Sequence, residues 1–271
     1  MTKNAPLGVF DSGLGGLTVV RALRAALPHE DIVYLGDTAR VPYGTKGPAT
    51  VTRYALACAS HLVARGVKAI VIACNTVSAV APALLRVELD LPVLEVIEPG
   101  ARAAAEATKS FKVGVLATAG TIASGAYPRA VASFSTRIET YGQAAPLLVP
   151  LAEEGWTEGE VPRLAARKYL EPLARAGVDV IVLGCTHYPL LFPVIEAEAK
   201  AMLGSGVTII DSARAVARDV AAFLASRDLA ADPARGAGSI RLLVTDVPKT
   251  FDDTASRFLG SAATGAEQVD L

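Results

Sequence analysis

Short apolar segments alternate with longer alanine-rich segments along most of the chain. The short segments are rich in Val, Ile and Leu and continuously apolar, a pattern typical of parallel strands buried on both faces. The expected strands are Leu7–Phe10, Ile32–Leu35, Ala69–Ala73, Val93–Val96, Val113–Leu116, Leu147–Val149, Val180–Leu183, Thr208–Ile210 and Ile240–Val244, and the expected helices include Leu17–Ala26, Pro48–Arg65, Arg102–Ser110 and Ala213–Ser226. This alternation predicts an α/β fold with mainly parallel sheets.

Two of these segments are nearly copies of each other. Gly66–Cys74 (GVKAIVIAC) and Gly177–Cys185 (GVDVIVLGC) each place a cysteine eight residues after a glycine, at the end of an apolar run. The segments that begin at Gly8 and Gly114 also match, and further strands are expected to end near Asp37 and Gln143. The repeat predicts two similar α/β domains related by an approximate two-fold axis. Residues 1–98 plus 208–271 would form the first domain, and residues 99–207 the second.

Polar side chains stand at the carboxyl ends of the expected strands. Open parallel sheets bind ligands beyond those ends. The residues concerned are Asp11 and Ser12, Asp37 and Thr38, Cys74, Asn75 and Thr76, Thr118 and Thr121, Glu153 and Glu154, and Cys185, Thr186 and His187. If the two domains face each other across these ends, all of these residues converge on one cleft.

The cysteines allow several interpretations. Cys58 lies within a helical segment and is interpreted as a small buried apolar residue. Cys74 and Cys185 each precede hydrogen-bonding residues and a helix start, which favours a thiolate. Two cysteines and a histidine also form metal sites, but the clustered spacing of zinc ligands is absent. A redox disulfide would bring the sulfurs to about 2 Å, which leaves no room for a substrate. Duplication at matching positions favours two bases on opposite sides of one ligand.

The neighbouring polar residues have structural interpretations as well. His187 is either a satisfied core histidine or a group that stabilises the Cys185 thiolate and moves protons. Asp11 either caps the next helix or faces the cleft opposite Thr118. For Asp37 and Glu153, the sequence allows either helix capping or a role in the cleft. The sequence leaves these alternatives to be decided by the structure.

Two glycine-containing segments lie near these strand ends. Gly13–Gly16 (GLGG) follows neither of the two common phosphate-loop patterns, so a nucleotide site is not expected. These glycines would instead let backbone amides approach a small carboxylate. Pro42-Tyr43-Gly44 is either an ordinary turn or a lid that brings a tyrosine to the cleft.

Composition narrows the possible partners and location. The formal net charge of the 271 residues is −1 and no basic stripe is present, so nucleic acid is not an expected partner. Hydrophobic residues make up 52%, yet polar residues interrupt every apolar run, so no membrane span is expected. Residues Met1–Leu7 lead straight into a strand-like segment, without a basic segment followed by an apolar one, so no signal peptide is expected. Three cysteines without a CxxC pair fit a reducing cytoplasm. Lys68 and Lys112 precede strands at the edge opposite the cleft, so no lysine-bound cofactor is expected.

The chain resembles the glutamate racemases of the aspartate/glutamate racemase superfamily. The resemblance is carried by Phe10–Thr18 (FDSGLGGLT), Gly36–Gly44 (GDTARVPYG), Ala73–Ala79 (ACNTVSA), Thr118–Tyr127 (TAGTIASGAY) and Leu183–Leu191 (LGCTHYPLL). These motifs keep the order of the family, and the similarity covers nearly the whole chain. Residues 226–239 carry no motif.

The resemblance implies cofactor-independent interconversion of L- and D-glutamate, which supplies D-glutamate for peptidoglycan. Cys74 would take the α-proton from D-glutamate and Cys185 from L-glutamate, assisted by Asp11 and His187 respectively, with Glu153 nearby. The implied substrate-binding residues are Asp11, Ser12, Pro42, Tyr43, Gly44, Asn75, Thr76, Thr118, Thr121 and Thr186. No metal or other cofactor is implied, a homodimer is expected, and activation by a peptidoglycan precursor is not.

Two other functions remain open at this stage. A related racemase could act on aspartate or another acid, since selectivity for side-chain length cannot be read from these residues. A two-domain binding protein without turnover would need at most one of the two cysteines.

Overall fold

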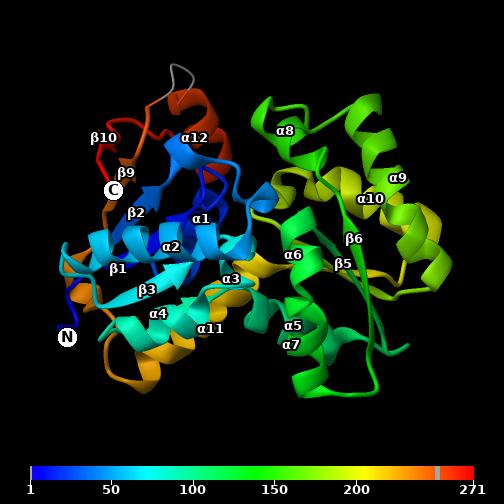
Figure 1. The fold of residues 1–271 in the computed structure, drawn as a ribbon, viewed down its shortest axis with the longest axis horizontal. Helices are drawn as coiled ribbons and strands as arrows, with labels where there is room; N and C mark the ends of the chain where they lie inside the picture. The colour runs from blue at the N-terminus through cyan, green and yellow to red at the C-terminus, as the bar shows by residue number, and fades with distance from the viewer. Residues whose placement is uncertain (1, 248–250) are drawn as a thin grey trace.

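The structure, a computed structural model, describes residues 2–247 and 251–271 and has two α/β lobes, each built around one sheet (Figure 1). The first sheet has the order β10-β9-β2-β1-β3-β4 and the second the order β6-β5-β7-β8. The first contains β1 (Leu7–Asp11), β2 (Ile32–Gly36), β3 (Ala69–Ile72), β4 (Val93–Glu95), β9 (Ile240–Val244) and β10 (Glu267–Gln268). The second contains β5 (Lys112–Ala117), β6 (Glu139–Ala144), β7 (Val180–Gly184) and β8 (Thr208–Asp211).

Strand pairing confirms the predicted fold class. The pairs in both sheets are parallel, from β1 with β2 and β3 to β7 with β8. The internal repeat is visible in the strand order, because β2-β1-β3-β4 in the first sheet has the same succession as β6-β5-β7-β8 in the second. The two cysteine segments therefore end equivalent strands, β3 and β7, each beside the central strand of its sheet.

Helices cover both faces of each sheet, which explains why the strands are continuously apolar. On the first sheet, α2 (Pro48–Val63) and α4 (Pro82–Glu88) pack on one face, and α1 (Leu17–Ala26), α11 (Ser212–Ser226) and α12 (Phe251–Leu259) on the other. On the second sheet, α9 (Glu160–Ala176) and α10 (Phe192–Leu203) oppose α5 (Ile97–Ala107) and α7 (Ala126–Phe134). Short elements lie at the strand ends: α3 (Asn75–Ser78), α6 (Ala119–Ser124), α8 (Leu148–Glu153), and 3-10 turns at Thr38–Arg40, Tyr43–Thr45, Tyr188–Leu191 and Pro233–Arg235.

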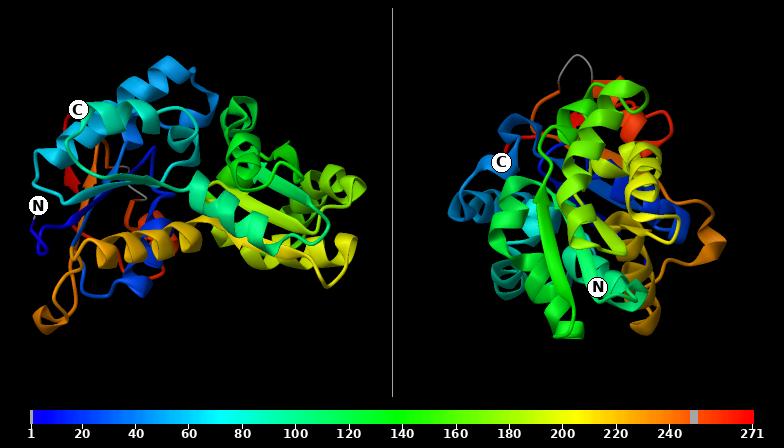
Figure 2. Two further views of the ribbon diagram at one scale, coloured as in Figure 1. Left: turned by 90° about the horizontal axis from the view of Figure 1, so that it is seen from below. Right: turned by 90° about the vertical axis from the view of Figure 1, so that its right-hand side faces the viewer.

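The chain passes between the lobes twice, so that both described ends of the chain lie in the first lobe (Figure 2). The first crossing follows β4 and leads through α5, close to the expected position near residue 98. The return lies later than expected. Residues 208–211 were assigned to the first domain, but they form β8 and pair with β7 in the second sheet, so the chain returns through α11.

One predicted strand is wrong. Residues 147–149 were expected as a strand, but Leu148–Glu153 forms helix α8. A short apolar run is compatible with either structure, and here the strand place beside β5 is taken by β6, which ends close to the expected position at Gln143. Among the described residues, no helix combines the length and the apolarity needed to cross a membrane.

Candidate active site

A cavity of about 320 Å³ lies between the two lobes, at the carboxyl ends of the central strands. The first lobe lines it with Ser12, Val41, Pro42, Tyr43, Gly44, Thr45, Cys74, Asn75 and Thr76, and the second with Thr118, Ala119, Pro146, Val149, Pro150, Glu153, Cys185, Thr186 and His187. Most residues predicted from the strand ends therefore meet at one place. Five of them do not line the cavity: Asp11, Asp37 and Thr121 are buried, and Thr38 and Glu154 are also absent from the lining.

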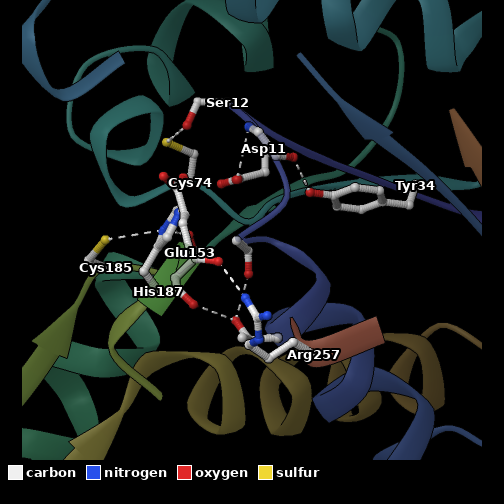
Figure 3. Close-up of polar contacts among 12 residues, drawn as sticks. Asp11, Ser12, Tyr34, Cys74, Glu153, Cys185, His187 and Arg257 are labelled. Atoms are coloured by element: carbon white, nitrogen blue, oxygen red, sulfur yellow. Dashed lines mark hydrogen bonds and ion pairs between the residues drawn. The ribbon is translucent and has the colours of Figure 1, made fainter. Parts of the chain in front are cut away.

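Cys74 occupies the first-lobe side of the cavity. It follows β3 and stands at the N-terminus of the short helix α3, and its Sγ lies 3.6 Å from the Ser12 hydroxyl oxygen (Figure 3). Burial, reinforced by the negative charge of Asp11, raises the pKa of the Cys74 thiol to about 12, although the Val77 backbone amide and Ser12 act in the opposite direction. In this state Cys74 is a protonated thiol at neutral pH and is equipped to donate a proton.

Asp11 supports this side from the end of β1. Its carboxylate is buried, and the Gly13 backbone N–H donates to Oδ2 at 3.1 Å, whereas Oδ1 has no hydrogen-bond partner. Burial raises the pKa of Asp11, and the charge of His187 partly offsets this effect. The carboxylate thus belongs to the charge balance around both Cys74 and His187 without lining the cavity.

Cys185 occupies the second-lobe side and is connected to a histidine and an acid. Its Sγ lies 3.8 Å from His187 Nδ1, and His187 Nε2 lies 3.0 Å from Glu153 Oε1 (Figure 3). Burial alone would lower the pKa of His187, but the contacts with Cys185 and Glu153 outweigh burial and raise it to about 10. The protonated imidazole thus places a positive charge beside Cys185 Sγ.

Glu153 reaches this chain of contacts from a helix. It was expected after a strand at residues 147–149, but it is the last residue of α8. Its side chain remains 45% exposed, whereas that of His187 is 8% exposed. The predicted proximity of Glu153 to His187 holds, even though the element that carries it was wrongly predicted.

Hydroxyl and amide groups link the two lobes beside the cysteines. The Thr118 hydroxyl lies 3.1 Å from that of Thr76 and 3.0 Å from that of Thr121. The Tyr127 hydroxyl donates to Asn75 Oδ1 at 2.8 Å, while the buried Asn75 Nδ2 has no partner. A buried donor without a partner at a cavity wall is suited to a ligand oxygen, because leaving it unpaired is costly.

Asp37 supports the Pro42-Tyr43-Gly44 segment through hydrogen bonds. The buried Asp37 carboxylate accepts hydrogen bonds from the Tyr43 hydroxyl, from Arg40 Nε at 2.6 Å and from the Thr245 hydroxyl at 2.9 Å. A Cβ on Gly44 would lie 2.9 Å from Thr118 Cβ, so this loop meets the second lobe closely. Asp37 therefore holds a wall of the cavity and does not line it.

The packing around Gly15 explains why the GLGG segment has a glycine at this position. A Cβ at this position would lie 2.4 Å from Thr186 Oγ1 and 2.6 Å from His187 Nδ1. The glycine lets the loop after β1 pass directly against the residues that follow Cys185. Sequence reasoning instead assigned these glycines to carboxylate binding by backbone amides.

The structure also places residues at the site that the sequence did not indicate. Pro146, Val149 and Pro150 form an apolar wall of the cavity. Arg257 and Phe258 of α12 contact Glu153 and His187 respectively. These contacts join residues far apart in the chain, so neither spacing nor periodicity could reveal them.

The three cysteines are free thiols, and Cys58 lies within α2, away from the cavity lining. Within residues 2–247 and 251–271, no cluster of three or more His, Cys, Asp or Glu side chains is placed to hold a metal ion. Lys68 is fully buried and paired with Glu30 at 2.5 Å. The cavity thus has one thiol from each lobe, Cys74 beside Ser12 and Cys185 beside His187.

Comparison with known proteins gives consistent matches. Residues 17–220 match the family model described as Asp/Glu/hydantoin racemase. The chain is 51% identical over 265 residues to a glutamate racemase of Geobacter metallireducens, covering 98% of this chain and 96% of that protein. The fold matches the crystal structure of a Bacillus anthracis glutamate racemase isoform, RacE1, with a TM-score of 0.93 at 37% identity, covering 99% of this chain and 98% of that one. It also matches a Francisella tularensis glutamate racemase in complex with D-glutamate, with a TM-score of 0.90, the same identity and the same coverage.

Proposed function

The chain belongs to the Asp/Glu/hydantoin racemase family and is an amino-acid racemase, and we propose that it interconverts L-glutamate and D-glutamate. The observation that carries the proposal is the pair of free thiols, Cys74 and Cys185, which end equivalent strands and line one cavity from opposite lobes. The full-length similarity to glutamate racemases supports glutamate as the substrate.

Two bases account for inversion at the α-carbon. With L-glutamate, the Cys185 thiolate removes the α-proton, and the electron pair of the broken C–H bond stays on the substrate as a carbanion. The Cys74 thiol then delivers its proton to the opposite face, which leaves Cys74 as the thiolate and Cys185 as the thiol. The raised pKa of Cys74 and the imidazolium of His187 beside Cys185 support this starting state. The reverse reaction begins with a thiolate at Cys74.

The cavity supplies groups for a dicarboxylate substrate. We assign binding of the two carboxylates and the ammonium group to Ser12, Tyr43, Asn75, Thr76, Thr118 and Thr186, with Pro42 and Gly44 shaping the wall. Asp11 and Thr121 act from behind, Asp11 on the charge around Cys74 and Thr121 through its contact with Thr118. Fixed donors facing a developing negative charge stabilise it without reorganisation, which is how a carbanion forms without an electron-accepting cofactor.

The biological setting follows from the same assignment. We propose that the enzyme needs no added cofactor and supplies D-glutamate for peptidoglycan synthesis. A homodimer and a cytoplasmic location remain predictions.

The proposal is tested by incubating the pure protein with L-glutamate, and separately with L-aspartate, in heavy water without added cofactor. Circular dichroism follows inversion, and NMR follows loss of the α-proton signal. We expect both signals to change with glutamate and to stay constant with aspartate. A change with aspartate alone would point to the related racemase, and no exchange with either acid would point to a binding protein.

Cysteine variants provide the matched controls. We expect Cys74→Ala and Cys185→Ala to lose racemisation, because each removes the base on one face of the substrate. Cys58→Ala should keep it, since Cys58 is buried in α2 and does not line the cavity. An active Cys185→Ala enzyme, or an inactive but folded Cys58→Ala enzyme, would overturn the assignment of the two bases.

A further inference from the structure

Helix α12 of the first lobe contacts the second lobe at the Cys185 side of the site. The helix packs on α1 of its own lobe. Two consecutive side chains extend from it to the second lobe: Arg257 Nη1 donates a hydrogen bond to the carbonyl oxygen of Glu153, and the Phe258 ring packs nearly perpendicular to that of His187, with 5.0 Å between centroids. One helix of the first lobe therefore touches both members of the Glu153–His187 pair.

The end of α8 is shaped to receive the Arg257 guanidinium. Glu153 is the last residue of α8, and carbonyls in the last turn of a helix lack partners within the helix. A basic side chain satisfies such a carbonyl and interacts favourably with the helix dipole. Gly155 follows with a φ of +76°, and a Cβ there would lie 2.8 Å from Arg257 Cζ. The glycine thus leaves the space that the guanidinium occupies.

Glu153 needs such an anchor because of its exposure. Its side chain is 45% exposed, so the contact with His187 must hold a long, solvated side chain in one conformation. Ordering such a side chain costs entropy, which weakens exposed ion pairs. Fixing the backbone from which the carboxylate extends reduces the freedom that remains to be lost.

We propose that Arg257 is a positioning residue that aligns Glu153 on His187, and so maintains the chain of contacts that ends at Cys185 (Figure 3). This inference rests on the proposed function of that chain as the Cys185 side of the racemase. Arg257 touches no reacting atom. Because it belongs to the other lobe, the alignment depends on the two lobes being in the arrangement seen here.

The charges around His187 allow a decisive test, because two explanations of the role of Arg257 predict opposite changes in the pKa of His187 when Arg257 is removed. Cys185, Glu153 and Asp11 face or influence the imidazole, and the contacts with Cys185 and Glu153 raise its pKa to about 10 against the effect of burial. If Arg257 aligns Glu153, removing it weakens the Glu153 contact and lowers the pKa of His187. If Arg257 acts only as a nearby positive charge, removing it raises that pKa.

The experiment measures the ring-proton NMR titration of the three histidines in the full-length protein. In Arg257→Met, we expect the pKa of His187 to fall by about one pH unit, comparable to losing most of a charge-assisted hydrogen bond. His29 and His61 should titrate as in the wild type. Arg257→Lys, which keeps a charged donor, should restore most of the His187 pKa. The matched control is Arg218→Met, an exposed arginine of α11 that lines a different groove.

Activity provides the second measurement. We expect Arg257→Met to lower kcat for L-glutamate about ten-fold with little change in KM, and to have no further effect in a Glu153→Gln background. An unchanged or raised pKa of His187 in Arg257→Met would overturn the proposal. Should that variant not fold, Arg257→Gln carries the same predictions. The NMR titration requires no turnover, so it judges this inference even if the wild type fails to racemise glutamate, which would refute the proposed function instead.

Discussion

Gly15 is expected to resist replacement, because no side chain fits between it and the residues after Cys185. An alanine Cβ would lie 2.4 Å from Thr186 Oγ1 and 2.6 Å from His187 Cε1 and Nδ1, whereas ordinary contact begins at 3.4 Å. The His187 ring cannot easily move away, since Glu153 contacts its Nε2 and Phe258 packs against it. Gly15→Ala must therefore displace either the loop or the histidine.

The size of the effect follows from this overlap. The shortfall is about 1 Å, and a misplacement of that size at a catalytic group costs on the order of 10²-fold in rate. Forcing a methyl group into a packed site also destabilises a protein by about 1–3 kcal/mol. We therefore expect Gly15→Ala to lose about 10²-fold in kcat/KM and to unfold at a lower urea concentration.

The assay compares kcat/KM for L-glutamate and urea unfolding in Gly15→Ala, Gly13→Ala and the wild type. Gly13→Ala is the control, because its Cβ would meet only Val41, with Cγ2 at 3.3 Å and Cβ at 3.9 Å, and Val41 is 42% exposed. The control should lose less than about three-fold in activity, because the exposed Val41 side chain can move aside. Wild-type activity in Gly15→Ala would refute the close packing described here.

Three further predictions concern Asp37, Thr118 and Cys58. Asp37→Ala removes the acceptor of Tyr43 and Arg40, so it should destabilise the protein by about 2–4 kcal/mol in urea unfolding. It should also raise KM, and an unchanged KM would contradict the support that Asp37 gives to the loop. Thr118→Val keeps the shape but removes a hydroxyl bonded across the lobes, so steady-state kinetics should show kcat/KM about ten-fold lower. Cys58 has its pKa raised by burial from 9.0 to about 12, so its stabilising contribution is present below pH 9 and lost as pH rises toward 12. The difference in unfolding free energy between wild type and Cys58→Ala should therefore shrink by about 1 kcal/mol from pH 9 to pH 10, and a constant difference would contradict a buried, protonated thiol.

The parts of the fold predicted correctly were those governed by local pattern. Buried parallel strands such as β1 and β7 are continuously apolar, and the repeat around Cys74 and Cys185 marked equivalent strand ends. The strand β6 (Glu139–Ala144) is only partly buried and has no such run, so only its end was indicated, by the repeat. Residues 147–149 were apolar enough to resemble a strand, yet Leu148 and Val149 begin a helix that has Pro150 in its first turn.

The parts that escaped prediction depend on contacts between distant segments. Gly15 is constrained by Thr186 and His187, and Arg257 by the end of α8, and neither constraint has a local signal. The position of the second crossing was wrongly predicted, because the apolar character of β8 does not indicate to which of the two sheets the strand belongs. For Asp37, the sequence could not distinguish a residue that lines the cavity from one that supports its wall.

The most direct test of the two-base account follows the isotope in the earliest product. L-glutamate is incubated with the enzyme in heavy water, the reaction is stopped at a few per cent conversion, and both enantiomers are separated and analysed by mass spectrometry. In the proposed mechanism Cys185 removes the proton and Cys74 delivers a deuteron taken from solvent, so the D-glutamate should carry deuterium while the remaining L-glutamate keeps its α-proton. Product that retains the original α-proton, or L-glutamate that gains deuterium as fast as product forms, would contradict two bases on opposite faces.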